Sequence, residues 1–369
     1  MPENKVTIGL VQTTVTENID LNLKRTMEKV REAAERGAKI VCLQELFLTG
    51  YFPQWEGKDA RALAETIPGP STKAFSALAE ELSIVIIVSV FEKDEAGYYN
   101  SVAVIDADGS LLPTYRKVHI PHDRFFYEKD YFSPGEEIRV YDTRYAKFAA
   151  LICYDQWFPE AARVAVLGGA EIIFYPTAIG WRKGEEEPEE GDWHDAWETM
   201  QRSHAIANGV CVAAANRIGR EERVLFWGSS FVCDSFGVVL GRASNSEEEV
   251  LVVELNLAKN QEVRESWGFF QNRRPDVYWP IIEMVREEDD TEKKAGEKEG
   301  KKDGAGLCLQ DTPRSLGYHM PAEWERHEAI WLSWPYDLQS FPEIEAVEKA
   351  YTAIIKTIHR RELVNLLVK

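Results

Sequence analysis

Apolar runs of strand length alternate with helical periods along the first half of the chain. β-branched and aliphatic residues, which favour strands, dominate three runs: "VTIGLVQ" (6–12), "KIVCLQE" (39–45) and "IVIIVSV" (84–90). Between them, apolar residues recur at helical spacing over 19–36 and 72–82, and Gly37 stands where a C-terminal helix cap belongs. The third run is apolar on both faces, so we expect a strand that is covered on both sides.

The second half of the chain repeats this order. Further strands are expected in "KFAALICYD" (147–155), "EIIFYP" (171–176) and "VCVAAAN" (210–216), with helices over 159–167 and 193–207. Two hairpins are expected, in "SVAVIDADGSLL" (101–112), with Asp-Gly at its turn, and in "SSFVCDSFGVVLG" (229–241). Two such halves predict an α/β fold in which two sheets pack face to face and the helices lie outside.

Composition changes abruptly near residue 286. The stretch "REEDDTEKKAGEKEGKKDGA" (286–305) contains no large apolar residue, and we expect a disordered linker because it cannot bury enough surface to offset its ordering entropy. It separates a domain over 1–285 from a segment over 306–369, which is short for an independent core. That segment stops at Lys369 after the apolar, strand-like "ELVNLLVK", so we expect it to be cut short.

Charge and composition disfavour several classes of partner. The 369 residues carry a formal net charge of −19, whereas binding to nucleic acid needs a concentrated positive surface. No stretch approaches the roughly 18 consecutive apolar residues of a membrane span, and the five cysteines are odd in number and far apart, as in a reducing compartment. We expect a cytoplasmic protein with neither a nucleic-acid nor a membrane partner.

Three ionisable residues end apolar runs: Glu45, Lys117 and Cys153. The carboxyl ends of strands are where ligands bind in α/β sheets, although each residue alone has an ordinary structural explanation. Together they suit acyl transfer. A thiol needs a base to become a nucleophile, and Glu45 can serve as that base, while Lys117 and the backbone N–H of Tyr154 can stabilise an oxyanion.

The segments "CLQELFLTGYF", "YRKVHIP" and "CYDQWFPEAAR" resemble the three signature segments of the nitrilase superfamily of carbon–nitrogen hydrolases. The resemblance covers roughly residues 5–283 and implies a four-layer α-β-β-α sandwich that forms a homodimer or a larger homo-oligomer. It implies Cys153 as nucleophile, Glu45 as general base and Lys117 as the oxyanion-stabilising cation. It also implies that Glu128, in "FFYEKDYFSPG", helps to position the substrate.

Within this superfamily, "CYDQWFPEAAR" and "FYPTAIG" are most similar to N-carbamoylputrescine amidases, which hydrolyse a terminal ureido group to putrescine, ammonia and carbon dioxide. The turn after the nucleophile carries an acid and aromatic residues and no cation before Arg163, which suits a small cationic ureido substrate. The expected substrate-binding residues are Glu128, Tyr51, Tyr154, Asp155 and Thr177. Plant-type members have a glycine-rich stretch where this chain has "HDRFFYEKD", so we expect a pocket of different width.

Two alternatives remain open from the sequence. One is another ureido or amide hydrolase of the superfamily, such as an N-carbamoyl-β-alanine amidohydrolase, which should place Arg or His beside the nucleophile to hold a carboxylate. The other is a catalytically silent scaffold protein. No nucleotide-binding motif is present, and Pro121 between His119 and His122 disfavours a metal site, so neither a cofactor nor a metal is expected.

The segment after the linker has a resemblance of its own. "TPRSLGYHMPAEWERHEAIWLSWP" is similar to the opening of agmatine deiminases, whose product is N-carbamoylputrescine. The catalytic residues of that family lie beyond the part that matches, so we expect an inactive fragment. Cys308 precedes the matching segment and is not expected to be a deiminase nucleophile.

Overall fold

The computed structural model describes residues 4–186 and 191–282, and in the C-terminal part residues 330–333, 344–358 and 364–367. The chain divides into two compact units, Met1–Ile282 and Glu283–Lys369. The expected linker over 286–305 and Cys308 lie outside the described residues.

The first six-stranded sheet of the large unit has the order β15-β1-β2-β3-β4-β5. Its strands are β1 (Lys5–Gln12), β2 (Ile40–Leu43), β3 (Val85–Lys93), β4 (Tyr98–Ile105), β5 (Tyr115–Arg116) and β15 (Glu249–Asn256). β1, β2 and β3 are parallel, whereas β15, β4 and β5 pair antiparallel with their neighbours. Helices α1 (Ile19–Glu35) and α2 (Pro70–Leu82) connect the parallel strands, as the helical spacing predicts.

The second six-stranded sheet has the order β14-β13-β10-β8-β7-β6. Its strands are β6 (Val140–Asp142), β7 (Lys147–Ala150), β8 (Ile172–Thr177), β10 (Cys211–Asn216), β13 (Phe231–Cys233) and β14 (Val239–Arg242). Helices α3 (Pro159–Leu167) and α4 (Trp193–Asn208) connect its parallel strands. β7 ends at Ala150, before the expected boundary at 155, because the chain turns into a 3₁₀ helix, η4 (Cys153–Trp157).

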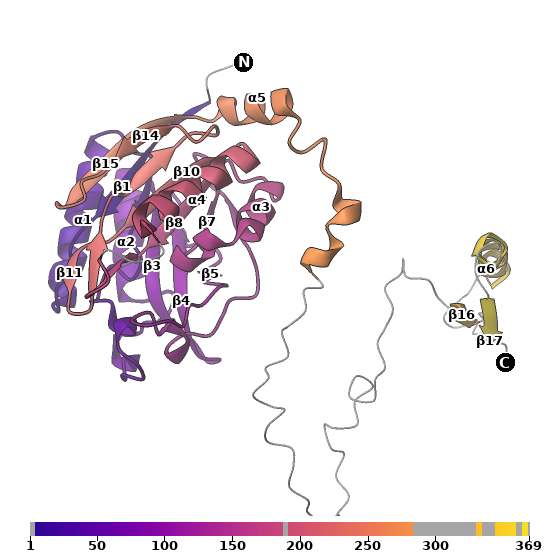
Figure 1. Ribbon diagram of the computed structural model, residues 1–369, viewed down its shortest axis with the longest axis horizontal. Coiled ribbons are helices and arrows are strands. Elements are labelled where there is room, and N and C mark those ends of the chain that lie inside the picture. The colour runs from indigo at the N-terminus through magenta and orange to yellow at the C-terminus, as the bar shows by residue number, and fades with distance from the viewer. Residues whose placement is uncertain (1–3, 187–190, 283–329, 334–343, 359–363, 368–369) are drawn as a thin grey trace, which may run out of the picture. The chain divides into compact units, whose positions relative to one another are not determined.

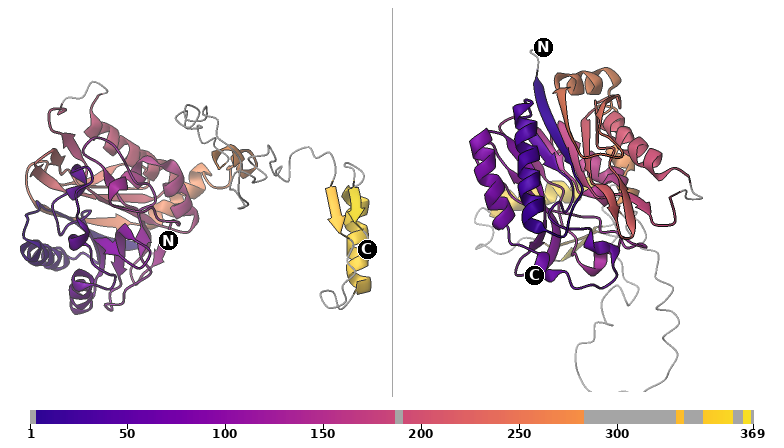
Figure 2. Two further views of the ribbon diagram at one scale, coloured as in Figure 1. Left: turned by 90° about the horizontal axis from the view of Figure 1, so that it is seen from below. Right: turned by 90° about the vertical axis from the view of Figure 1, so that its left-hand side faces the viewer.

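The two sheets face each other, and each carries its helices on the outside (Figures 1 and 2). The side chains of β3 alternate between the two faces of its sheet, which explains this arrangement. Val85 and Ile87 belong to the core between the sheets, whereas Ile86 and Val88 pack with Phe75 beneath the outer helices. The four-layer α-β-β-α sandwich and the strand covered on both sides are therefore confirmed.

Shorter elements border the sandwich. A three-stranded sheet has the order β11-β12-β9 and consists of β9 (Gly180–Arg182), β11 (Ile218–Glu221) and β12 (Val224–Trp227). The 3₁₀ helices are η1 (Phe52–Gln54), η2 (Arg61–Leu63), η3 (Glu128–Asp130), η5 (Pro275–Val277) and η6 (Trp279–Ile281), and helix α5 (Ala258–Trp267) follows β15. Both hairpins form: Gly109 has φ +80° in the turn between β4 and β5, and β13 pairs with β14.

The C-terminal unit contains a β-α-β arrangement. β16 (Ile330–Ser333) and β17 (Val364–Leu367) pair in parallel, and α6 (Ile344–Ile358) lies between them in the sequence. The strand-like ending expected from "ELVNLLVK" is confirmed by β17.

Candidate active site

The three residues singled out at strand ends lie beyond β2, β5 and β7. Glu45 follows β2 by two residues, Lys117 directly follows β5, and Cys153 begins η4 after β7. β2 and β5 belong to one sheet and β7 to the other, so the two facing sheets supply the group jointly. Glu45 and Lys117 are fully buried, and Cys153 is 7% exposed.

A buried ion-pair network joins the acids to the lysine. The ammonium of Lys117 donates to Glu45 Oε1 at 2.9 Å and to Glu128 Oε2 at 2.6 Å. Asn100 Nδ2 donates to Glu45 Oε1 at 2.7 Å, and the Tyr51 hydroxyl donates to Glu128 Oε1 at 2.7 Å. Glu45 Oε2 has no partner among the described residues. One oxygen of Glu45 is therefore held in place while the other remains able to accept a proton.

The local backbone presents Cys153 in an uncommon conformation. Its φ is +43°, in the left-handed region that non-glycine residues rarely adopt, at the sharp turn from β7 into η4. Its Sγ lies 3.8 Å from the carbonyl oxygen of Ala178. The first N–H groups of a helix have no acceptor within it, so the N–H of Tyr154 is available beside the sulfur.

Burial and the surrounding charges set the protonation of the site. Burial raises the pKa of the Cys153 thiol well above its usual range, Glu45 raises it further, and Lys117 lowers it. Burial alone would lower the pKa of Lys117, but the carboxylates of Glu128 and Glu45 reverse this and raise it. Burial also raises the pKa of Glu128 to about 7, against the opposing effect of Lys117. The resting site therefore holds a protonated lysine and a neutral thiol.

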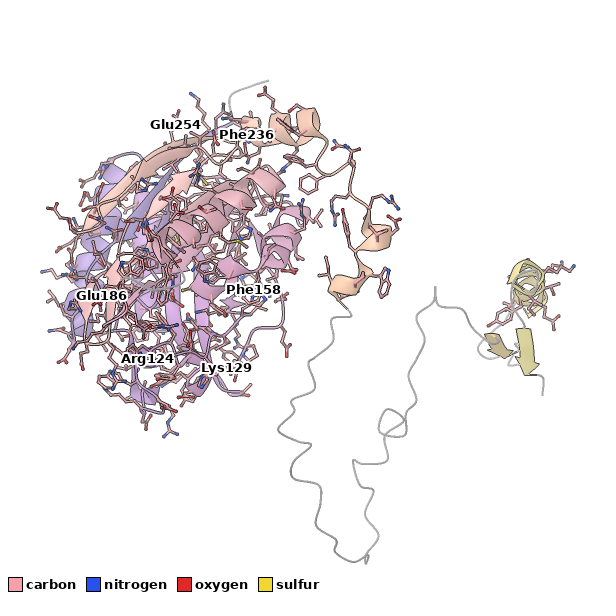
Figure 3. The ribbon with its side chains drawn as sticks, viewed as in Figure 1. Arg124, Lys129, Phe158, Glu186, Phe236 and Glu254 are labelled. Atoms are coloured by element: carbon pink, nitrogen blue, oxygen red, sulfur yellow. The ribbon has the colours of Figure 1, made fainter. Side chains whose placement is uncertain are left out.

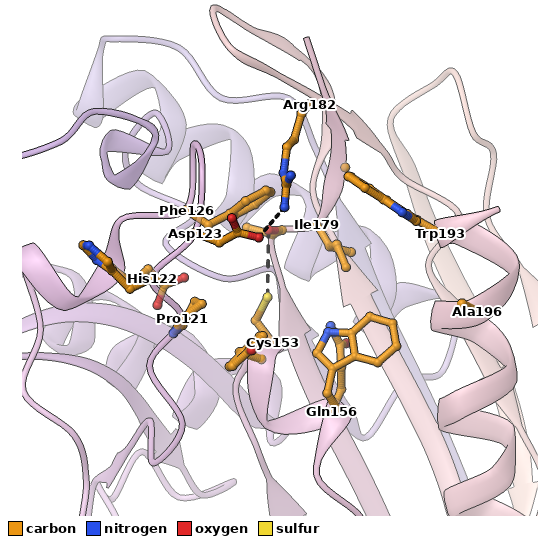
Figure 4. A pocket seen from close by; sticks show the side chains of 15 residues that line it. Pro121, His122, Asp123, Phe126, Cys153, Gln156, Ile179, Arg182, Trp193 and Ala196 are labelled. Carbon is orange, nitrogen blue, oxygen red and sulfur yellow. Dashed lines mark hydrogen bonds and ion pairs between the residues drawn. The ribbon is translucent and has the colours of Figure 1, made fainter. Parts of the chain in front are cut away.

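A pocket of about 310 Å³ opens beside Cys153 (Figure 4). Four aromatic side chains contribute to its wall: Phe126, Tyr154, Trp157 and Trp193. Besides Tyr154, its ionisable lining residues are His122, Asp123, Glu128, Cys153 and Arg182. The volume suits a small ligand, and the mixture of aromatic faces with a few charged groups is typical of a small-molecule site.

The structure separates the expected substrate contacts into two groups. Glu128 and Tyr154 line the pocket. Tyr51 and Thr177 are fully buried and do not line it. Tyr51 acts on Glu128 through its hydroxyl, and the Thr177 hydroxyl donates to the carbonyl oxygen of Tyr175 at 2.9 Å. The expectation that Tyr51 and Thr177 contact the substrate is therefore corrected: Tyr51 holds Glu128, and Thr177 holds the backbone at the end of β8.

Asp155 is fully buried and does not line the pocket, although the sequence indicates a substrate contact. A 3₁₀ helix has three residues per turn, so Cys153 and Gln156 share one side of η4 and Asp155 points elsewhere. Its carboxylate accepts from the Tyr115 hydroxyl at 2.7 Å, from the backbone N–H of His119 at 3.0 Å and from that of Ile152 at 2.8 Å. The expectation that Asp155 contacts the substrate is therefore corrected: Asp155 fixes the start of η4.

Three further residues hold or line the site, and the sequence motifs do not indicate them. Asn100 on β4 holds Glu45, and Arg182 at the end of β9 brings a cation into the pocket although none follows Cys153 closely in sequence. Arg217 Nη2 donates to the carbonyl oxygens of Glu45 and Leu46 at 3.1 and 2.7 Å. None of these residues stands beside a signature segment, and their roles depend on contacts between segments distant in sequence.

The histidines have structural contacts. His119 Nδ1 lies 2.7 Å from Asp155 Oδ1, and its ring stacks on Phe158, which Figure 3 labels, at 3.7 Å between centroids. His204 Nε2 lies 2.8 Å from the carbonyl oxygen of Gln156. In the described part of the chain, no three His, Cys, Asp or Glu side chains are placed to hold a metal ion, and no helix is long and apolar enough to cross a membrane.

Comparison with known families decides the class of this site. Residues 7–265 match the family model of carbon-nitrogen hydrolases. The chain belongs to the carbon-nitrogen hydrolase family. The resemblance inferred from the three signature segments is confirmed, and the chain is an amide-hydrolysing enzyme. Residues 319–369 match the model of Porphyromonas-type peptidyl-arginine deiminases, in agreement with the deiminase-like resemblance of that segment.

Two curated carbon-nitrogen hydrolases illustrate the similarity. An N-carbamoylputrescine amidase of Solanum lycopersicum is 42% identical over 291 residues, which cover 76% of this chain and 95% of that protein. A citrullinase of Francisella tularensis is 41% identical over 283 residues, which cover 75% of this chain and 98% of that protein. These similarities agree with an amide-hydrolysing enzyme, and the two relatives carry the names of different substrates.

Two solved structures share the fold. A carbon-nitrogen hydrolase from Helicobacter pylori has a TM-score of 0.71 and 39% identity, with 75% of this chain and 98% of that chain covered. An amidase from Nesterenkonia sp. AN1 has a TM-score of 0.60 and 25% identity, with 75% and 96% covered. The latter structure shows covalent addition of the acetamide moiety of fluoroacetamide at its active site cysteine.

Proposed function

We propose that this carbon-nitrogen hydrolase cleaves the terminal ureido group of N-carbamoylputrescine, giving putrescine, ammonia and carbon dioxide. The observation that carries the proposal is the buried network in which Lys117 joins Glu45 and Glu128 beside the pocket-lining thiol of Cys153. The covalent cysteine adduct in the Nesterenkonia amidase supports Cys153 as the nucleophile.

In the first half of the reaction, Glu45 Oε2 takes the thiol proton as Cys153 Sγ attacks the ureido carbon. The ammonium of Lys117 and the N–H of Tyr154 stabilise the oxyanion that forms. When the tetrahedral intermediate collapses, a C–N bond breaks and Glu45 returns the proton to the departing nitrogen. Ammonia leaves, and the substituted carbamoyl group remains bound to the sulfur.

In the second half, Glu45 removes a proton from a water molecule, which attacks the same carbonyl carbon. The C–S bond breaks, and the Cys153 sulfur recovers its proton from Glu45. The product is a carbamate, which releases carbon dioxide and the free amine. Glu45 thus acts as a base and as an acid in each half, and the oxygen without a hydrogen-bond partner suits this shuttling.

Two observations support an amine-bearing substrate. Aromatic faces of Trp157 and Trp193 line the pocket, and such faces attract ammonium groups. The match of residues 319–369 to a deiminase model supports the ureido group of that substrate, because a deiminase converts a guanidino group into a ureido group.

A second candidate is hydrolysis of a ureido α-amino acid such as citrulline. Arg182 lines the pocket, and a guanidinium can bind a carboxylate. The similarity to the Francisella citrullinase points to the same chemistry.

A substrate panel tests both candidates. Ammonia release is measured with N-carbamoylputrescine, citrulline and N-carbamoyl-β-alanine, for the wild type and for Cys153→Ala. We expect the highest kcat/KM with N-carbamoylputrescine and no turnover by the variant. A preference for either acid would overturn the proposed substrate. Wild-type rates no higher than those of Cys153→Ala would instead favour the silent scaffold.

We also propose that the chain forms a homodimer or a larger homo-oligomer. Apolar side chains stand exposed on the outer helices, among them Val164 and Leu167 on α3 and Ile206 on α4. Light scattering after size exclusion tests this, with a monomer mass as the result that contradicts it.

A further inference from the structure

The pocket contains a second charged group besides the one around the nucleophile. Asp123 and Arg182 form an ion pair that lines the pocket, and Figure 4 shows this pair on the wall above Cys153 in that view. Asp123 comes from the loop after β5, and Arg182 ends β9. Neither residue contacts the network of Glu45, Lys117 and Glu128, so the mechanism leaves this pair without a role.

Arg182 is the member of the pair that other side chains hold in place. Its Nη1 donates to Glu185 Oε2 at 3.1 Å, and its guanidinium lies 4.9 Å from the centre of the Trp193 ring. Its side chain is 19% exposed. Two carboxylates, those of Asp123 and Glu185, already offset its charge. Arg182 is therefore poorly placed to attract a further anion.

Asp123 is the member of the pair that remains accessible to a ligand. Its side chain is 63% exposed, and it accepts from the backbone N–H of Arg124 at 2.6 Å as well as from Arg182. A carboxylate has about four acceptor positions, so Asp123 can accept further hydrogen bonds. Glu128, the other carboxylate of the pocket wall, is fully buried, and both of its oxygens are bonded. An ammonium that enters the pocket thus meets Asp123 as its accessible anion.

We propose that Asp123 is the specificity-determining residue that binds the distal ammonium of an ω-aminoalkyl urea, and that Arg182 is a positioning residue that holds the Asp123 carboxylate toward the pocket. Phe126 and Trp193, which line the pocket, provide aromatic faces for the same cation. This inference rests on the proposed function, because it concerns the tail of the ureido substrate, and it names the feature that selects an amine.

The test compares two substrates that differ in one group. N-carbamoylputrescine ends in an ammonium, and n-pentylurea has a methyl group in its place. Steady-state ammonia release gives kcat/KM for both with the full chain as wild type, as Asp123→Asn and as Asp59→Asn. Asp59 is a matched control, because it is an exposed aspartate paired with Arg61 and does not line the pocket.

We expect Asp123→Asn to lower the preference for the cationic over the neutral substrate by about fivefold, chiefly through KM, since a partly exposed charge pair contributes modestly. Asp59→Asn should keep the wild-type preference. If Asp123→Asn loses kcat/KM equally with both substrates, or if the preference does not change, the inference is overturned. The activity of the wild type on N-carbamoylputrescine would still uphold the proposed function. A wild type that hydrolyses only ureido acids would overturn the proposed function itself. Arg182→Gln provides a second test. If this variant loses kcat/KM only with ureido acids, Arg182 binds the carboxylate of the substrate, and the inference is overturned.

Discussion

Arg217 is predicted to hold Glu45, the proposed general base, in its catalytic position. This buried arginine follows β10, and its Nη2 donates to the carbonyl oxygens of Glu45 at 3.1 Å, Leu46 at 2.7 Å and Thr49 at 3.0 Å. Its Nη1 donates to Glu221 Oε1 at 2.6 Å. Leu46 adopts a positive φ of 48°, so the segment after Glu45 is a turn that depends on these contacts.

The contacts of Arg217 also extend, through Glu221 and Tyr51, to Glu128. Glu221 Oε2 accepts from the backbone N–H of Tyr51 at 2.6 Å, and the Tyr51 hydroxyl bonds Glu128. Arg217 therefore positions both carboxylates that contact Lys117 without itself lining the pocket. A change at Arg217 should alter the orientation of catalytic groups more than substrate affinity.

The test substitution is Arg217→Lys, which keeps the charge. A single ammonium cannot reach Glu221 and all three carbonyl oxygens, so about two hydrogen bonds are lost, which costs about 2 kcal/mol of stability. A displacement of Glu45 by roughly 1 Å lowers kcat by about a hundredfold. We expect that loss in kcat with KM nearly unchanged, measured by ammonia release and by denaturant unfolding.

Arg264→Lys on α5 is the matched control. Arg264 also binds backbone carbonyl oxygens, those of Asn208 at 3.1 Å and Ala170 at 3.2 Å, but among the described residues it makes no hydrogen bond to the network around Lys117, and it does not line the pocket. This variant should lose stability and keep its kcat. If both variants lose stability equally and retain wild-type kcat, the positioning role of Arg217 is refuted.

Three further predictions concern the remaining buried polar groups. Tyr51→Phe leaves a buried oxygen of Glu128 with one donor fewer, so denaturant unfolding should show a loss of about 1–3 kcal/mol. Glu128 has a pKa raised from 4.5 to about 7, so the native state binds the extra proton, and stability present below pH 4.5 is lost as the pH rises to about 7. The unfolding free energy of the wild type relative to Glu128→Gln should fall by about 3 kcal/mol over that range. Asp155→Asn removes one of two acceptor oxygens that fix η4, and kcat should fall about tenfold while the preference between cationic and neutral substrates stays unchanged.

Each of these predictions has a result that contradicts it. Unchanged stability of Tyr51→Phe would mean that its hydroxyl does not support Glu128. A pH-independent difference between the wild type and Glu128→Gln would mean that the carboxyl titrates at its usual pKa. A changed substrate preference in Asp155→Asn would restore Asp155 as a substrate contact.

The sequence predicts those parts of the molecule that depend on local pattern. Helical spacing predicts α1 and α2, because apolar residues recur every three or four positions along one face, and the apolar run of β3 indicates burial on both faces. The sequence wrongly indicates Asp155 as a substrate contact, because the residue lies in a 3₁₀ helix, whose period is not visible in so short a stretch.

Residues that act across the fold could not be predicted in the same way. Arg182 reaches the pocket through the small sheet of β9, β11 and β12, and its pairing with Asp123 joins segments 59 residues apart. Arg217 contacts the turn after Glu45 from about 170 residues away. Such contacts follow from how the sheets pack, and no motif near Glu45 or Cys153 indicates them.

In the proposed reaction, Cys153 forms a covalent bond to the ureido carbon and Glu45 transfers the protons. Glu45→Gln should slow both halves, and after mixing with N-carbamoylputrescine and rapid acid quench, mass spectrometry of the peptides measures any trapped adduct. We predict an aminobutylcarbamoyl adduct on the peptide that contains Cys153, and none with Cys153→Ala. Turnover by Cys153→Ala, or an adduct on Cys42, Cys211 or Cys233 instead, would contradict it.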